Sequence, residues 1–258
     1  DGQKTGLFPS KGGGAWLLAL QECRLKGIER LENSMPEKRM ALSSPATRPD
    51  QASGVALIFS PLLAKAVRDK DKVGSHIVWA QIETDVSAAD IIVVNVYMPH
   101  FGRQSPSADD VYGDLTRLFR SFDKDPRKRR AIKVLMGDFN GRIAQAYDFT
   151  GKKRPGAKSE EERESRATEV TGCWSVHRTD NEMGGKLREF LGDHSMVSAG
   201  TYFRPRQKSA GASTYVPFGD YAARKSAGLD HVCISRQWSS SVVNVRVRWH
   251  PSENRWAN

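Results

Sequence analysis

Cysteine and long apolar runs are both scarce in this sequence. The 3 cysteines, Cys23, Cys173 and Cys233, lie far apart and form no Cys-x-x-Cys pair. An odd number at such spacing argues against a disulfide framework and a zinc ribbon, and it favours a reducing intracellular compartment. The longest apolar run, Ala15 to Leu20, is far shorter than the roughly 20 residues that cross a bilayer. We therefore expect no transmembrane helix and no membrane partner, and the run lacks the context of a signal peptide.

Nucleotide-binding signatures and internal repeats are also absent. Without a G-x-G-x-x-G motif or a P-loop, the sequence gives no sign of a dinucleotide-binding or P-loop domain. Positive charge is in excess: 40 Lys and Arg face 30 Asp and Glu in 258 residues, for a net charge of +10. This excess favours a polyanionic partner, although it can also serve solubility alone. From the length we expect a single domain over residues 1–258, with edges that are incomplete or divergent.

Short segments rich in β-branched residues predict strands. Those at Val55 to Phe59 and Ile91 to Val94 are continuously apolar, so we expect them to be buried on both faces. Val243 to Trp249 alternates between apolar and polar residues and predicts a half-exposed strand near a sheet edge. The remaining predicted strands are Ile77 to Ile82, Ile91 to Val96, Ile132 to Met136 and His231 to Ser235.

Two amphipathic helices are predicted. The clearer one runs from about Ser107 to Phe122, with Ser107 as its N-cap and apolar residues along one stripe. The second lies near Gly185 to Leu191 and ends by Gly192. Strands and helices mix without regular βαβ alternation, which indicates an α+β or sandwich fold.

Charged or small residues dominate three stretches that we expect to be exposed loops. Lys124 to Lys133 and Gly151 to Glu169 contain almost no apolar residues, so neither can bury a face. Lys208 to Gly228 is dotted with Ser, Ala and Gly and is similarly loop-like.

Polar or acidic residues lie directly beside four strand-like runs, where each strand would emerge at the rim of a sheet. They are Glu22, Tyr97, Asp138 with Asn140, and Asp230. Because strand side chains alternate, Asp138 and Asn140 should project to the same side. If the other strand ends are their neighbours, Glu22, Tyr97 and Asp230 join them in one cleft.

Such a set of side chains suits the cleavage of a phosphodiester bond. A hard divalent ion, Mg²⁺ first and Mn²⁺ as the alternative, takes carboxylate and amide oxygens and neutralises charge on the phosphate. Asp138, with Asn140 as a nearby donor, can position a water and take its proton, while the Tyr97 phenol can donate to a phosphate oxygen. Each motif alone is an ordinary strand end or turn sequence, so the hypothesis depends on their combination.

Five segments carry a resemblance to a known family. They are Leu20 to Arg24, Gly54 to Ser60, Val94 to Pro99, Leu135 to Asn140 and Leu229 to Ser235. In these segments and in their order, the sequence resembles the endonuclease/exonuclease/phosphatase superfamily, which includes apurinic endonucleases and DNase I. Asn181 to Phe190 and Gly200 to Phe203 look most like the apurinic-type endonuclease domain of non-LTR retrotransposons.

The resemblance implies both a fold and roles for the strand-end residues. The fold would be a two-layer β-sandwich flanked by helices, the DNase I-like four-layer α/β sandwich. By resemblance, Glu22 would bind Mg²⁺, Asp138 would activate or orient the attacking water and contact the metal, and Asn140 would hold the phosphate or the metal's water. Tyr97 would support the transition state, and Asp230 matches the carboxylate that orients a catalytic histidine in the family.

The resemblance also implies a partner, which is DNA, and a function, which is the nicking of DNA for retrotransposition. Arg142, Arg204, Arg206 and Lys208 are the candidate phosphate contacts. Thr214 matches a phosphate-contacting threonine. We expect a monomeric, nuclear domain excised from a larger polyprotein that includes a reverse transcriptase.

Two departures from the family pattern bear on activity. Nothing before Leu20 matches the family's opening strand, so we expect the first strand to be missing. Ser252-Glu253-Asn254 stands where the family closes with Ser-Asp-His, and an asparagine cannot carry a proton. Loss of one such group costs about 10²- to 10⁴-fold in rate, which would impair the endonuclease. The alternatives are a catalytically decayed nucleic-acid-binding domain, or an enzyme of the same fold that acts on small phosphoesters or phospholipids.

Overall fold

The structure is a computed structural model that describes residues 14–23, 40–44, 54–84, 89–100, 102, 106–145, 170–204, 214 and 227–245. These residues form two β-sheets. The large sheet has six strands in the order β4 (Val67–Val73), β5 (Ile77–Ile82), β6 (Ile91–Tyr97), β7 (Ile132–Asp138), β9 (Asp230–Ser235) and β8 (Met196–Ser198). The small sheet has three strands in the order β1 (Leu17–Leu20), β3 (Val55–Phe59) and β2 (Met40–Ser44).

Strand direction in the large sheet brings three strand ends to one edge. All neighbours are antiparallel except β6 and β7, which are joined through α3 (Ala108–Lys124) and α4 (Pro126–Arg130). A parallel pair needs such a crossover rather than a tight turn. In this register Tyr97 pairs with Asp138, so β6 and β7 end together. Strand β9 begins at the same edge, with Asp230 opposite Asp138.

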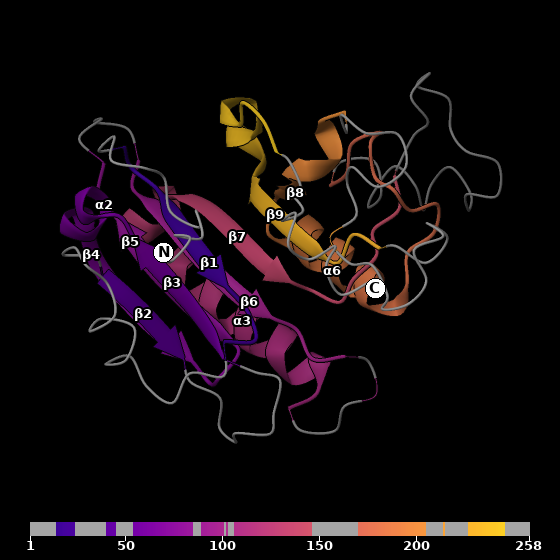
Figure 1. Cartoon of the computed structure of the whole chain (residues 1–258), viewed down its shortest axis with the longest axis horizontal. Coiled ribbons are helices and arrows are strands. Elements are labelled where there is room, and N and C mark those ends of the chain that lie inside the picture. Colours follow the sequence, from indigo (N-terminus) through magenta and orange to yellow (C-terminus); the bar gives the residue numbers. More distant parts are fainter. Residues whose placement is uncertain are drawn as a thin grey trace, which may run out of the picture.

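The large sheet packs on both faces. Its β5 and β6 meet the small sheet through a buried cluster that includes Leu57, Phe59, Val78 and Val93. Its other face is covered by α3 and α6 (Glu182–Asp193). Figure 1 shows the small sheet in front of β5 and β6, with α3 behind them. The predicted α+β sandwich flanked by helices is therefore confirmed.

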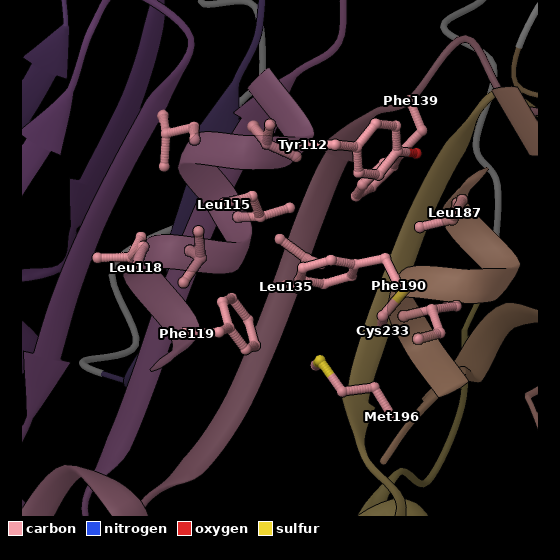
Figure 2. Packing of buried hydrophobic residues seen from close by; sticks show 14 of the residues in the cluster. Tyr112, Leu115, Leu118, Phe119, Leu135, Phe139, Leu187, Phe190, Met196 and Cys233 are labelled. Carbon is pink, nitrogen blue, oxygen red and sulfur yellow. The ribbon is translucent and has the colours of Figure 1, made fainter. Parts of the chain in front are cut away.

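Helix α3 supplies much of the core, because its apolar stripe faces the sheet as predicted. Leu115, Phe119 and Phe122 are fully buried. The Phe119 ring meets that of Phe190 in α6 edge-on, with 5.2 Å between ring centroids. Figure 2 shows side chains of α3 and α6 converging over Leu135 of β7. The predicted N-cap is confirmed, since Ser107 forms a capping box with Asp110.

Five predicted strands are present as β3, β5, β6, β7 and β9. Strand β3 is buried along its whole length, and residues 92–94 of β6 are buried as well, as their continuous apolarity predicts. Helix α6 begins three residues earlier than predicted, at Glu182, because the Asn181 side chain accepts the Gly184 N–H and caps it.

Two stretches differ from the expectation. Residues 126–130, expected in a loop, form α4, because Asp125 caps the helix and Pro126 suits its first turn. The helix buries no residue, so its charged side chains remain on the surface as expected. The predicted strand start at Val243 is wrong: residues 243–245 form no strand, and the Val243 side chain is 92% exposed after the 3-10 helix η2 (Arg236–Ser241).

Other expectations fall outside the described residues. They concern residues 1–13 of the segment before Leu20, where we expect the opening strand to be missing, and residues 246–249 of the predicted last strand. The loop expected at 151–169 and most of the loop expected at 208–228 lie outside as well. The single-domain boundaries likewise stay a prediction. No helix in the described part of the chain has the length and apolarity needed to span a membrane.

Candidate active site

Two aspartates face each other at the edge where β6, β7 and β9 meet. Asp138 is the last residue of β7, Asp230 is the first of β9, and the two pair directly in the antiparallel register. Directly opposed residues point to the same face of a sheet, with Cβ atoms about 4.5–5.5 Å apart. Like charges at this spacing repel each other, so the arrangement disfavours the ionised pair.

Burial and neighbouring charges shift the ionisation of Asp138 and Asp230. Burial raises the pKa of Asp138 from its ordinary 3.8 to about 6, and the carboxylates of Asp230 and Glu22 add to the rise. The N–H of Asn140 acts in the opposite direction. Burial, together with Glu22, also raises the pKa of Asp230. The structure therefore brings three of the predicted acidic residues within electrostatic reach of each other.

The chain turns sharply after Asp138, and Asn140 holds the turn. Asn140 adopts a φ of 48°, in the left-handed region that few non-glycine residues occupy. Its backbone N–H donates to Asp138 Oδ1 at 2.8 Å, and its Nδ2 donates to the Met98 carbonyl at 2.7 Å. Asn181 Nδ2 donates in turn to the Asn140 carbonyl at 3.1 Å. The Asn140 side chain is 6% exposed and ties strand ends together, so its role as a metal or phosphate ligand stays a prediction.

Glu22 reaches the site from the small sheet, just beyond the end of β1. It is exposed and has a φ of 53°, again in the left-handed region. The buried side chain of Asn95 fixes its approach, because Nδ2 donates to the carbonyls of Leu20 at 2.8 Å and Ala56 at 3.0 Å. Gln21 Nε2 donates to Asn95 Oδ1 at 2.6 Å. Asn95 thus joins β6 to both β1 and β3, two residues before Glu22.

Tyr97 ends β6 beside Asp138, but its ring lies in the core. Alternation along the strand sends Val93 and Tyr97 toward the small sheet, and Tyr97 is 0% exposed, hydroxyl included. The ring stacks on His76 with 5.9 Å between centroids. The predicted contact between this phenol and a phosphate is not open in this structure and stays a prediction.

The segment before Asp230 is held by two side chains. Thr214 Oγ1 accepts the N–H groups of Leu229 at 2.9 Å and Asp230 at 3.0 Å, and its hydroxyl lowers the pKa of Asp230 against the effect of burial. His177 Nε2 accepts the Gly228 N–H at 2.9 Å. Thr214 therefore orients Asp230, while its predicted phosphate contact remains untested.

The predicted phosphate-binding residues divide into two groups. Arg142 and Arg204 are exposed, and Arg142 lies two residues beyond Asn140. Arg206 and Lys208 lie outside the described residues, as do residues 252–254 at the divergent terminal motif.

We call the sheet edge with Glu22, Asp138 and Asp230 the acidic edge. It suits a metal ion that keeps much of its water shell better than an ion that protein side chains coordinate fully. In the described ranges, no three His, Cys, Asp or Glu side chains gather closely enough to hold a metal by themselves. Zn²⁺ needs three or four such ligands, whereas Mg²⁺ keeps several waters and needs one or two carboxylates. A cation near Glu22, Asp138 and Asp230 would offset the burial and the repulsion that raise the pKa values of Asp138 and Asp230. The donor chemistry therefore fits Mg²⁺ or Mn²⁺.

Sequence reasoning missed the residues that hold these acids in place. Asn95 is a lone amide in an apolar strand, which is the signal that could have identified a buried polar link. Asn181 lies 41 residues from the Asn140 carbonyl to which it donates, and His177 lies 51 residues from the Gly228 N–H that it accepts. No local pattern marks such long-range partners.

Two packed sheets, helices on one face and acidic strand ends at one edge define this molecule's class. No family model and no curated protein matches the chain. Solved structures do match. The 3'-5' exonuclease NExo from Neisseria meningitidis has a TM-score of 0.57 at 17% identity, covering 93% of this chain and 82% of its own. The AP endonuclease LMAP from Leishmania major has a TM-score of 0.59 at 17% identity, with coverages of 88% and 72%.

A second Neisseria structure, described as the 3' phosphatase NExo bound to product DNA hairpin, gives a TM-score of 0.54 at 15% identity and covers 87% of this chain and 77% of its own. Likeness at such low identity establishes the fold alone. The chain has the DNase I-like fold that the resemblance implies. Its place in the retrotransposon branch stays a prediction.

Proposed function

We propose that this chain is a phosphodiester hydrolase that acts on DNA at the edge formed by Glu22, Asp138 and Asp230. The observation that carries the proposal is the directly opposed pair of Asp138 and Asp230, both with raised pKa values and with Glu22 close enough to contribute. Carboxyl groups that converge from separate elements and perturb one another are typical of catalytic sites.

Asp138 is the residue proposed to act on the attacking water. With a pKa of about 6 it is mostly ionised at neutral pH, yet it is basic enough to accept a proton. Asn140 fixes the carboxylate by its N–H to Oδ1, so Oδ2 is the oxygen proposed to face the water. The water oxygen attacks phosphorus, its proton passes to Asp138, and the bond from phosphorus to the leaving oxygen breaks.

Glu22, Asp138 and Asn140 are the residues proposed to hold Mg²⁺, with Mn²⁺ as a substitute. When bound, the ion would neutralise charge on the scissile phosphate. Asp230 adds negative charge on the neighbouring strand, and Thr214 keeps it oriented. Because Asn254 replaces the family's histidine, the leaving oxygen would take its proton from solvent, and we propose a correspondingly slow enzyme.

DNA is the proposed substrate for two reasons. The net charge of +10 and the exposed Arg142 near the acidic edge favour a polyanion over a small phosphoester. The structural neighbours are described as an exonuclease, an AP endonuclease and a phosphatase bound to DNA, which supports the same substrate class. A role in retrotransposition rests on the sequence resemblance alone.

A plasmid-nicking assay tests the proposal. Wild-type protein should convert supercoiled plasmid to open circles with Mg²⁺ and not with EDTA. Asp138→Asn should slow nicking by at least about 10²-fold, because it removes the base without changing the size of the side chain. Asp193→Asn is the matched control, since Asp193 is exposed at the far end of α6, and it should retain the wild-type rate. Equal nicking by all three proteins, or nicking in EDTA, would contradict the proposal.

The second candidate is a domain that binds DNA without cutting it, and the Ser252-Glu253-Asn254 ending favours it. Salt-sensitive DNA binding with no open-circle product after long incubation would support this candidate. Recovery of nicking in Asn254→His would instead support an active site that lacks one group.

A further inference from the structure

An exposed aromatic and cationic surface lies near the acidic edge. Arg204 lies over the indole of Trp174, with its Cζ 5.5 Å from the ring centroid. Arg204 is exposed and Trp174 is half-buried, so the indole supports the guanidinium from the protein side. Tyr202, two residues earlier, is 44% exposed and is the one aromatic among the strongly exposed large apolar side chains of the described residues. We call Trp174, Tyr202 and Arg204 the stacking surface.

The backbone under the stacking surface is firmly held. The N–H of Trp174 donates to the Thr201 carbonyl at 2.9 Å, and that of Gly172 donates to Thr201 Oγ1 at 2.7 Å. Thr201 Oγ1 donates onward to the Ser198 carbonyl at 2.7 Å. A Cβ at position 172 would lie 2.4 Å from the Thr201 carbonyl oxygen, so glycine is needed for this approach. A surface held in this way loses little conformational entropy when it binds a ligand.

Hydrogen bonds connect this surface to the acidic edge through one short segment. Ser175, next to Trp174, donates its hydroxyl to the Ile143 carbonyl, three residues beyond Asn140. His177 then bridges to Ala144 and accepts the N–H of Gly228, two residues before Asp230. The segment that carries Trp174 is thus hydrogen-bonded to the chain shortly after Asp138 and to the chain shortly before Asp230.

The charge around the surface suits a nucleic acid. Arg142, Arg178 and Arg204 are all exposed, and Arg142 and Arg178 lie within two residues of the bridged pair Ala144 and His177. The neighbouring acid, Asp180, is engaged by Arg188 at 2.7 Å, so its charge is compensated. Phosphates would meet the arginines, while the flat guanidinium and the tyrosine ring offer faces on which bases stack. Base pairing in a duplex keeps those faces covered, so unpaired nucleotides fit the surface best.

We propose that the stacking surface binds unpaired nucleotides of the DNA strand that the acidic edge acts on. This inference rests on the proposed function for its substrate class. It adds that single-stranded or locally opened DNA, rather than continuous duplex, is the preferred form. Tyr202 and Arg204, with Trp174 supporting the guanidinium, determine this preference.

Binding measured without turnover tests this inference. Fluorescence anisotropy in EDTA compares a labelled single-stranded 20-mer with its blunt duplex over a range of salt concentrations. Trp174→Ala should weaken single-strand binding about 5- to 100-fold and leave its salt slope unchanged, with duplex binding nearly unaffected. Trp174→Phe should restore most of the affinity. Arg204→Ala should weaken binding and reduce the salt slope by about 0.7, the value of one phosphate contact on a single strand.

Arg117→Ala is the matched control, because Arg117 is 73% exposed on α3 and its ion-pair partner, Asp114, lies on the same helix. It should bind both DNAs as the wild type does. The inference is overturned if Trp174→Ala and Arg204→Ala bind the single strand normally. It is also overturned if they lose single strand, duplex and base-free polyphosphate to the same extent. Because Arg204 is exposed, its variant keeps the test decisive even if Trp174→Ala fails to fold.

The inference and the proposed function can fail separately. Asp138→Asn should keep the wild-type preference for single strand over duplex, since it alters the acidic edge and not the stacking surface. A protein that binds unpaired DNA through Trp174 but never nicks keeps the inference and contradicts the function. If the protein nicks with Mg²⁺ but Trp174→Ala and Arg204→Ala leave single-strand binding unchanged, the function is kept and the inference is contradicted.

Discussion

At the scale of single residues, unfavourable features concentrate at the acidic edge. Glu22 and Asn140 have φ values of 53° and 48°, and each such backbone conformation costs on the order of 1 kcal/mol or more. Asp138 and Asp230 add opposed like charges on adjoining strands. Features of this kind persist where the surrounding structure enforces them, here through Asn95, Met98 and Thr214, and they are typical of functional sites.

The raised pKa of Asp138 predicts how stability depends on pH. The folded-state pKa is about 6 and the unfolded value is 3.8, so between these limits the folded state binds more protons. The stability of the metal-free protein should therefore fall as pH rises from about 4 to above 6. Asp138→Asn removes this charge and should raise stability at pH 8 by on the order of 2 kcal/mol, with little gain near pH 4. Thermal melts at both pH values measure the difference.

Metal addition provides the complementary measurement. Mg²⁺ should raise the melting temperature of wild type at pH 8 and have a much smaller effect on Asp138→Asn, because the variant has lost a proposed ligand. A gain from Asp138→Asn that is equal at pH 4 and pH 8 would contradict the account of the acidic edge.

Residues that carry charge at strand ends could be predicted from the sequence, whereas their supports could not. Asp138 ends an apolar strand, which marks it in the sequence. Strand alternation does not extend to Asn140, because Asn140 lies in the turn with a φ of 48°. Tyr97 is buried because its face of the large sheet packs on the small sheet. That packing is tertiary structure, which the local sequence does not reveal. Asn95 and His177 act across the sandwich or between loops, where sequence spacing gives no guidance.

At the scale of elements, α6 links the core to the acidic edge through its first turn. Its N-cap, Asn181, accepts the Arg142 N–H at Oδ1 at 2.7 Å and donates its own N–H to the Arg142 carbonyl at 3.2 Å. Gly184 lies so close to this segment that a Cβ there would be 1.9 Å from the Arg142 carbonyl oxygen. The start of α6 therefore positions the turn that contains Asn140.

Two adjacent glycines in α6 predict opposite effects of the same substitution. Gly184→Ala should destabilise the protein by about 1–3 kcal/mol and slow nicking, because the Arg142 backbone must move. Gly185→Ala should stabilise it by about 0.5–1 kcal/mol, because no atom lies within 4 Å of the added Cβ and alanine favours the helix. Urea unfolding of both variants measures the signs, and a loss of stability of similar size in both would contradict this packing.

The elements themselves were predictable where their pattern is long or purely apolar. Helix α3 and strands β3, β5 and β6 meet that condition. Helix α4 was missed because its basic residues form no apolar face, although Asp125 and Pro126 provide a local start signal. Strand β4 was missed because its exposed, charged residues form the sheet edge, and charged edge strands lack the usual apolar signal.

At the scale of the whole molecule, the site lies at the border between the two sheets. The small sheet covers β5 and β6, and its β1 delivers Glu22 beside β7 and β9. Figure 1 shows β7 and β9 extending beyond the small sheet. The relative placement of the sheets therefore determines whether the acidic residues converge, and the parallel register of β6 and β7 sets where they do so.

The most direct test of the central claim is a double-mutant cycle on nicking rate with Mg²⁺, using Asp138→Asn, Asp230→Asn and the double variant. Residues that act as one unit show strongly non-additive losses. The account predicts that Asp138→Asn and Asp230→Asn each slow nicking and that the double variant is about as slow as the slower single variant. The control Asp193→Asn should leave the rate unchanged, both alone and combined with Asp138→Asn. Losses that multiply as for independent sites, or a wild type with no Mg²⁺-dependent product, would contradict it.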